Sequence, residues 1–204
     1  MLFDDTYRTI AAPAEGLFKD RGSRFLAFAF PVTTEDEIKI HLERLRKEHF
    51  GANHHCYAWR LGADKQRFRA NDDGEPSGTA GRPILGQLQS FDLTNVAVIV
   101  VRYFGGTLLG AGGLVQAYKQ SAAEALKAAT IIEKHITEVY ALHFNYDAMN
   151  AVMKLLKEFE AEQRSQVFEI ECSLEFSVRM RDADALCTAL KKLDNVELKW
   201  IASR

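Results

Sequence analysis

The pattern of apolar and polar residues divides the chain into segments whose periods are typical of strands or of helices. Apolar and β-branched runs bounded by turn residues predict strands at Thr6–Ala12, Gly16–Lys19, Ser23–Pro31, His54–Arg60, Arg67–Arg69 and Asn95–Val101. Apolar residues three and four positions apart predict helices from Thr33 or Thr34 to about His49, through Ile84–Leu88, and from Leu114 to Thr130. The first part of the chain is therefore expected to mix strands with helices around one core.

After Thr130 the pattern changes from helical to alternating without a Pro or Gly linker, which indicates a domain boundary at Thr130–Glu133. We therefore expect two domains, residues 1–133 and residues 134–204. The second is predicted to contain Thr137–Tyr146, Asp147–Phe159, Ala161–Phe168, Glu171–Met180, Asp182–Leu193 and Val196–Ile201, in the order strand, helix, strand, strand, helix, strand. This βαββαβ order is that of the ferredoxin-like fold, so the predicted fold class is α+β.

Two glycine-rich turns flank the apolar strand at Asn95–Val101. The first, Asp72–Pro83, combines carboxylates, hydroxyls, glycines and one arginine, which is turn chemistry. Its glycines leave backbone N–H groups bare, and such groups form a concavity for anions, beside which Arg82 adds a fork suited to phosphate or carboxylate. Ser77 or Thr79 could cap the short helix that follows. Alternatively, the carboxylates of this turn satisfy its own backbone N–H groups.

The second turn, Arg102–Gly113, follows the apolar strand and precedes the helix at Leu114–Thr130. A strand, a glycine turn and a helix N-terminus in that order commonly hold an anionic group. Ala111 and Gly112 stand where a P-loop has Lys followed by Ser or Thr, so nucleotide hydrolysis by a P-loop mechanism is not expected. The alternative is that these glycines only permit tight turns and close backbone packing.

His54, His55 and Cys56 are adjacent in sequence, but a strand places neighbouring residues on opposite faces. His54 and Cys56 therefore share one face, and His55 lies on the other. A zinc site would need further ligands such as Asp72 or Asp73, so we favour a partly buried structural or hydrogen-bonding His54 and expect no metal.

The two turns carry a resemblance to a known family. The stretches DDGEPSGTAGRPIL and VVRYFGGTLLGAGGLVQAY resemble the signature of the Impact/YigZ family of small cytosolic proteins, with support from KDRGSRF at Lys19–Phe25 and ANHHCYAWRL at Ala52–Leu61. The resemblance implies a first domain with the fold of the second domain of ribosomal protein S5, followed by a small ferredoxin-like domain. It also implies a link to translation, because eukaryotic relatives act in control of the amino-acid starvation response. Asp20, Arg21 and Gly22 interrupt the family's basic run, so either Lys19 or Arg21 could take the basic role.

The composition argues against a strongly basic nucleic-acid-binding protein, a disulfide-rich protein and a membrane protein. The net charge is −2, so no global field attracts the chain to nucleic acid or to anionic membranes, and any basic surface must be local. Cys56, Cys172 and Cys187 are too scattered for a disulfide framework and fit a reducing cytosol. Neither a signal peptide nor a membrane-spanning apolar run is present, so we expect a cytoplasmic protein without membrane contact.

Two hypotheses of function follow. The first is a non-enzymatic binding protein linked to translation, whose partner is RNA, the ribosome or a ribosome-associated protein and which uses no cofactor. Under this hypothesis Tyr103 and Phe104 would supply base stacking. The second is an enzyme acting on a phosphorylated or nucleotide-like small molecule, with Asp72, Asp73 or Glu75 as a base or Mg²⁺ ligand. The candidate ligand-binding or phosphate-binding residues are Lys19, Arg24, His54, Arg60, Asp72, Asp73, Glu75, Ser77, Gly78, Thr79, Gly81, Arg82, Arg102, Tyr103, Gly105, Gly106 and Lys119.

Overall fold

The computed structural model describes residues 5–167 and 171–203, which form two compact units. Residues 7–134 make one unit, and residues 135–203 make the other together with Asp5 and Thr6. The sequence pattern did not indicate that the first residues of the chain group with its last part. In the described part of the chain, no helix is both long enough and apolar enough to cross a membrane.

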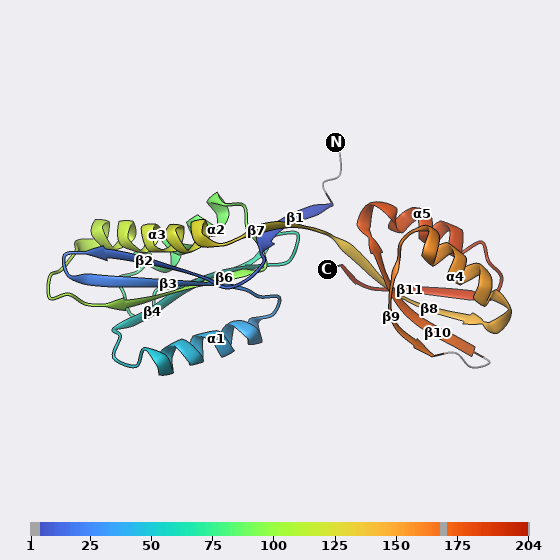
Figure 1. Cartoon of the computed structure of the whole chain (residues 1–204), viewed down its shortest axis with the longest axis horizontal. Coiled ribbons are helices and arrows are strands. Elements are labelled where there is room, and N and C mark those ends of the chain that lie inside the picture. The colour runs from blue at the N-terminus through green and yellow to red at the C-terminus, as the bar shows by residue number, and fades with distance from the viewer. Residues whose placement is uncertain (1–4, 168–170, 204) are drawn as a thin grey trace. The chain divides into compact units, whose positions relative to one another are not determined.

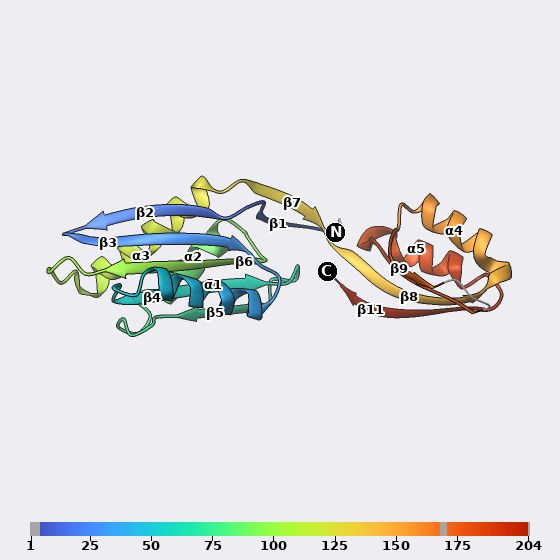
Figure 2. The same ribbon diagram turned by 60° about the horizontal axis from the view of Figure 1, so that its bottom comes forward.

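The first unit is built on a five-stranded antiparallel sheet in the order β2-β3-β6-β4-β5, which Figure 2 shows from the side of α1. Its strands are β2 (Ala14–Asp20), β3 (Ser23–Pro31), β6 (Val96–Tyr103), β4 (His54–Leu61) and β5 (Arg67–Asn71). The apolar run Val96–Val101 is fully buried because β6 is the central strand and is covered on both faces.

Helices cover both faces of this sheet (Figure 1). The helices α2 (Gly81–Ser90) and α3 (Gly110–Ala128) pack on one face, and α1 (Glu35–Glu48) packs on the other. The side chain of Thr34 accepts a hydrogen bond from the backbone N–H of Glu37, so Thr34 caps α1. A Cβ on Gly16 would lie 2.3 Å from the backbone nitrogen of Ala125, so this glycine lets α3 lie directly against β2.

Strand alternation sorts the side chains of β4 as the sequence predicted. Cys56 and Ala58 belong to the core under α2 and α3, whereas Trp59 and Leu61 belong to the core under α1. His54 lies at the start of the strand, on the α3 face. The two faces of the sheet therefore present different sets of polar groups.

A small two-stranded sheet pairs β1 (Thr6–Ile10) with β7 (Ile131–His135). The sequence pattern had predicted no strand at the positions that form β7. The strand could not be predicted because it is short and its last three side chains are exposed, so it shows no alternation of buried and exposed positions.

The second unit is a four-stranded antiparallel sheet in the order β11-β8-β10-β9 with two helices. Its elements are β8 (Thr137–Asn145), the 3₁₀ turn η1 (Tyr146–Ala148), α4 (Met149–Glu158), β9 (Glu162–Val167), β10 (Glu171–Arg179), α5 (Met180–Leu190) and β11 (Val196–Ser203). This is the predicted order of strands and helices, although Phe168, the expected end of one strand, lies outside the described residues. Leu142, Phe176 and Leu186 are among the side chains that form its separate core.

A further difference from the predicted elements is the start of α3. The helix begins at Gly110, not at Leu114, so the second glycine turn ends earlier than expected. Its first turn contains glycines and one alanine, which carry no apolar periodicity that could reveal a helix. The short helix predicted at Ile84–Leu88 is likewise longer and spans Gly81–Ser90.

Candidate functional site

In the first glycine-rich loop, backbone N–H groups bind a carboxylate of the loop itself, that of Asp72. The Asp72 carboxylate accepts hydrogen bonds from the backbone N–H groups of Gly78 (2.8 Å), Ala80 (3.0 Å) and Gly81 (2.8 Å). Burial tends to raise the pKa of Asp72, but these donors and the nearby Arg82 outweigh it, and the pKa is lowered. The concavity that the sequence predicted for an external anion is therefore already filled. The turn follows the alternative interpretation, in which its carboxylates satisfy its own backbone N–H groups.

Asp73 is also engaged within the protein. Its carboxylate accepts from the backbone N–H of His55 (2.7 Å) and from Nη2 of Arg46 (3.1 Å). Its carbonyl oxygen lies 2.9 Å from Nδ1 of His54. Asp73 thus ties the loop to the start of β4 and to α1, which is a structural task.

The hydroxyls of the loop do not cap α2. The Thr79 hydroxyl donates to the carbonyl oxygen of Pro76 (2.6 Å), and the residue at the cap position, Ala80, has no side chain that could accept. Ser77 and Arg82 are exposed, and Arg82 forms no ion pair within the described residues. The predicted cap by Ser77 or Thr79 was therefore wrong, because Asp72 satisfies the first N–H groups of the helix instead.

A buried polar network lies beneath the loop. Oε1 of Glu75 accepts from Nη1 of Arg102 (2.5 Å) and from the hydroxyl of Tyr118 (2.8 Å). Sγ of Cys56 lies 3.2 Å from that hydroxyl oxygen, and Nε2 of His54 lies 3.8 Å from Oε1 of Glu75. Burial raises the pKa of both the Tyr118 hydroxyl and the Cys56 thiol, so both stay protonated at neutral pH.

Arg102 is only partly satisfied by this network. Its side chain is 6% exposed, and its Nη1 donates to Glu75. Nε is buried without an acceptor, and no hydrogen bond from Nη2 to the described residues is found. Because an arginine carries five N–H donors, most of its donor capacity remains for something else.

A pocket of about 400 Å³ opens beside this arginine. We call it the Arg102 pocket; it is lined by Asn53, His54, Glu75, Pro76, Arg102, Phe104, Leu108, Leu109, Gly110, Ala111 and Leu114. The start of α3 forms one wall, and no side chain caps the backbone N–H groups there. The positive end of the helix dipole and a buried guanidinium thus meet in one cavity whose other walls are largely apolar.

The glycines of the second turn have different tasks. A Cβ on Gly105 would lie 1.9 Å from the carbonyl carbon of Gly22, so Gly105 is needed for close contact with the turn before β3. Gly106 and Gly110 have positive φ angles of 87° and 71°, and a Cβ on either would meet open space. Gly105 therefore follows the packing alternative, whereas Gly110 allows the turn that starts α3.

Several sequence-predicted residues lie away from the Arg102 pocket. Lys19, Arg24 and Tyr103 share the sheet face on which α1 packs, with the guanidinium of Arg24 4.9 Å from the ring centre of Tyr103. Arg60 lies six residues along β4 from His54, roughly 20 Å away, and faces Asp92. Lys119 is exposed on α3 and forms no ion pair in the described part of the chain.

The structure adds Tyr118 and Leu108, which sequence reasoning had not placed at the site. Tyr118 had been assigned to the apolar stripe of its helix, and only its hydroxyl contact with Glu75 reveals a polar role. Phe104, which the sequence had suggested for base stacking together with Tyr103, is 45% exposed at the pocket wall, and Leu108 is 82% exposed there. A large apolar residue a few positions after this aromatic residue, on the same glycine-rich loop, is the signal that could have found Leu108.

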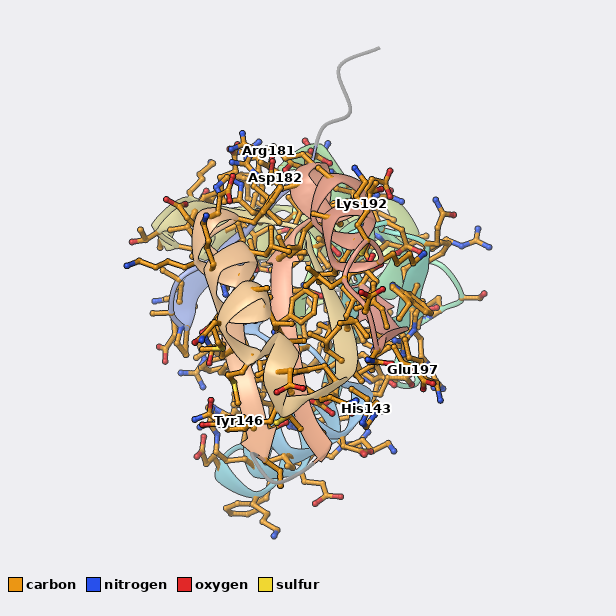
Figure 3. All side chains as sticks on the ribbon, turned by 90° about the vertical axis from the view of Figure 1, so that its right-hand side faces the viewer. His143, Tyr146, Arg181, Asp182, Lys192 and Glu197 are labelled. Carbon is orange, nitrogen blue, oxygen red and sulfur yellow. The ribbon has the colours of Figure 1, made fainter. Side chains whose placement is uncertain are left out.

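The second unit has a pocket of about 440 Å³ near the end of β8. His143 and Glu197, which are paired positions of β8 and β11, lie together at this pocket (Figure 3). No buried side-chain atom without a partner is found among the described residues of this unit, and no group of metal-binding side chains occurs in the described chain. The Arg102 pocket is therefore the better candidate.

Comparisons with known proteins find relatives of this chain. The family model of the Impact N-terminal domain matches residues 21–126. IMPACT family member YvyE of Bacillus subtilis (strain 168) is 31% identical over 93% of this chain and 88% of its own length. IMPACT family member YigZ of Escherichia coli (strain K12) is 39% identical over 72% of each chain.

A solved structure, described as the crystal structure of a hypothetical protein, superposes with a TM-score of 0.76 at 31% identity. The match covers 97% of this chain and 98% of that one, so the two share one fold over both units. With a matching family model and relatives that align over most of its length, this chain belongs to the IMPACT family.

Proposed function

We propose that the first unit is a non-enzymatic binding module that acts in translation by holding RNA phosphate groups at the Arg102 pocket. The supporting observation is the buried guanidinium of Arg102, which has nitrogens without an acceptor beside the uncapped start of α3. Both features favour an anion, and phosphate oxygens fit an arginine fork well. The link to translation comes from the family resemblance.

Exposed basic residues outside the Arg102 pocket supply the electrostatic part of the proposal, as contacts for phosphates that flank the bound one. Arg24 is on the strand that pairs with the end of β6, on the sheet face opposite the pocket, and Arg82 follows the loop whose Glu75 and Pro76 line the pocket. Neither forms an ion pair within residues 5–167 and 171–203. Unpaired cations are available to phosphates, and their counterion release makes binding sensitive to salt.

The second hypothesis, an enzyme acting on a phosphorylated small molecule, has less support in the geometry. Its base or Mg²⁺ ligands were to be Asp72, Asp73 and Glu75. Asp72 accepts three backbone hydrogen bonds, Asp73 is bound to β4 and α1, and Glu75 is paired with Arg102. Carboxylates held in this way are poorly placed to accept a substrate proton, so binding is the function we propose.

We further infer the two fold assignments that the resemblance implies. The strand order β11-β8-β10-β9 with α4 and α5 supports a ferredoxin-like second unit. For residues 7–134 we propose the fold of the second domain of ribosomal protein S5, in a cytoplasmic protein.

The proposal is tested by ribosome co-sedimentation and by RNA filter binding at low and high salt. The test variant changes the exposed Arg24, Arg82 and Lys119 to Gln. We expect weaker association and a salt dependence whose slope falls by about one for each phosphate that is no longer neutralised.

The matched control changes Lys154, Lys157 and Lys192 of the second unit to Gln, which alters the net charge equally. Its association should stay close to that of the unmodified protein. Equal losses in the two variants would mean that only net charge matters, and no association of the unmodified protein at either salt would refute the proposed function.

A further inference from the structure

We propose that the Arg102 pocket receives one unstacked nucleotide of a single-stranded RNA, with the base against Phe104 and Leu108 and the phosphate beside Arg102. The inference rests on the proposed function and deepens it, because it names the form of RNA that the site selects. Three features of the pocket carry it: its size, its donors and its apolar rim.

The size of the pocket favours a single nucleotide. Its volume of about 400 Å³ lies in the range typical of sites for small organic molecules. A base within a duplex is stacked and paired, so it cannot enter a cavity of this size without being extruded. Single strands, loops and ends of RNA offer bases that are already free.

Two kinds of hydrogen-bond donor line the pocket. Arg102 is nine-tenths buried, yet only its Nη1 has an acceptor among the described residues. Gly110 and Ala111, at the start of α3, line the same cavity, and their N–H groups have no side-chain cap. Unsatisfied donors of an arginine and of a helix start are independent observations, and both call for an acceptor such as a phosphate oxygen.

The pocket also has an apolar rim. Phe104 and Leu108 are large apolar residues with 45% and 82% of their surface exposed, and both line the pocket. The Arg102 guanidinium lies 5.7 Å from the ring centre of Phe104, so the ring already has one cationic neighbour. An aromatic side chain beside a cation is the usual platform for a base of single-stranded nucleic acid.

The backbone of the loop is suited to presenting this platform. The N–H of Phe104 donates to Oδ1 of Asn53 (2.9 Å), and the N–H of Gly105 donates to Oγ of Ser23 (3.1 Å). Gly105 also lies directly against Gly22. These contacts hold the backbone at Phe104 in place before any ligand arrives, which reduces the ordering cost of binding.

The test measures fluorescence anisotropy of a labelled single-stranded RNA, the same sequence as a blunt duplex, and the single strand with an abasic backbone. We expect the intact single strand to bind more tightly than the other two. Phe104→Ala should weaken binding of the single strand by roughly fivefold to 150-fold and leave binding of the abasic strand unchanged. Phe104→Trp should preserve binding.

Phe50→Ala is the control, because Phe50 is 90% exposed and does not line the pocket. It should bind all three RNAs as the unmodified protein does, and urea unfolding should show that the Phe104 variants remain folded. Equal binding of single strand, duplex and abasic strand, unaffected by Phe104→Ala, would overturn this inference and leave the proposed function standing. Binding of none of the RNAs would overturn both.

Discussion

Replacing Asp72 by Asn should destabilise the first unit by about 3 kcal/mol at neutral pH. The carboxylate accepts three backbone hydrogen bonds, two at one oxygen and one at the other. The amide of Asn keeps one accepting oxygen, so one charge-assisted bond of about 2 kcal/mol is lost and two bonds weaken by about 0.5 kcal/mol each. This sum is a large fraction of the stability of a typical domain.

The effect should depend on pH in a defined direction. The folded-state pKa of Asp72 is lowered, because the backbone donors outweigh burial, which acts to raise it. Its contribution is therefore fully present above the unfolded pKa and is lost as the pH falls through the lower folded pKa. The difference between the unmodified protein and Asp72→Asn should shrink below about pH 4.

Tryptophan fluorescence provides an assay for this unit alone. Trp59 is buried in the first unit, and the other tryptophan, Trp200, lies in the second. In a Trp200→Phe background, urea unfolding followed by fluorescence thus reports the free energy of unfolding of the first unit. Glu15→Gln, at an exposed position of β2, is the control and should change it by less than about 0.5 kcal/mol. A loss below about 1 kcal/mol for Asp72→Asn, or one that is equal at neutral and acid pH, would refute the reasoning.

Three further predictions concern the same region. Gly105→Ala should destabilise the first unit by more than about 3 kcal/mol, because the new Cβ would overlap the backbone of Gly22 and Ser23. Gly112→Ala on α3 should instead stabilise the unit by up to about 1 kcal/mol. Thermal unfolding measures both changes, and similar effects of the two substitutions would contradict this prediction. Glu75→Gln and Arg102→Met should each cost about 3–5 kcal/mol, and the double variant less than their sum, because each single change leaves one buried charge without its partner. Burial raises the pKa of Cys56, so a thiol reagent at neutral pH should label this cysteine only as fast as the protein unfolds. Peptide mass spectrometry measures the rate of labelling. Rapid labelling of Cys56 in the folded protein would be inconsistent with this geometry.

Most helices and strands could be predicted from the sequence because their apolar periods are local. The alternation at His54–Arg60 also predicted correctly which side chains share a face. In contrast, β7 is short with mostly exposed side chains, and the first turn of α3 has too few apolar side chains to show a period.

The candidate site was harder to predict, for a chemical reason. A loop with Asp72 and several glycines has the same composition whether its N–H groups bind a ligand or its own carboxylate, and only the folded geometry separates these cases. The sequence also grouped Arg24 and Tyr103 with Arg102, although the sheet places them on opposite faces.

The contribution of Asp5 to the second unit limits how freely the two halves of the chain can be exchanged. Asp5 binds Arg179 through two side-chain hydrogen bonds, and its carbonyl oxygen accepts from the N–H of Ile136. The second unit is therefore assembled from both ends of the polypeptide. A recombination event that joined residues 135–204 to another protein would leave Asp5 behind. The transplanted unit would lose these three hydrogen bonds unless its new partner supplied a carboxylate and a carbonyl oxygen in the same places.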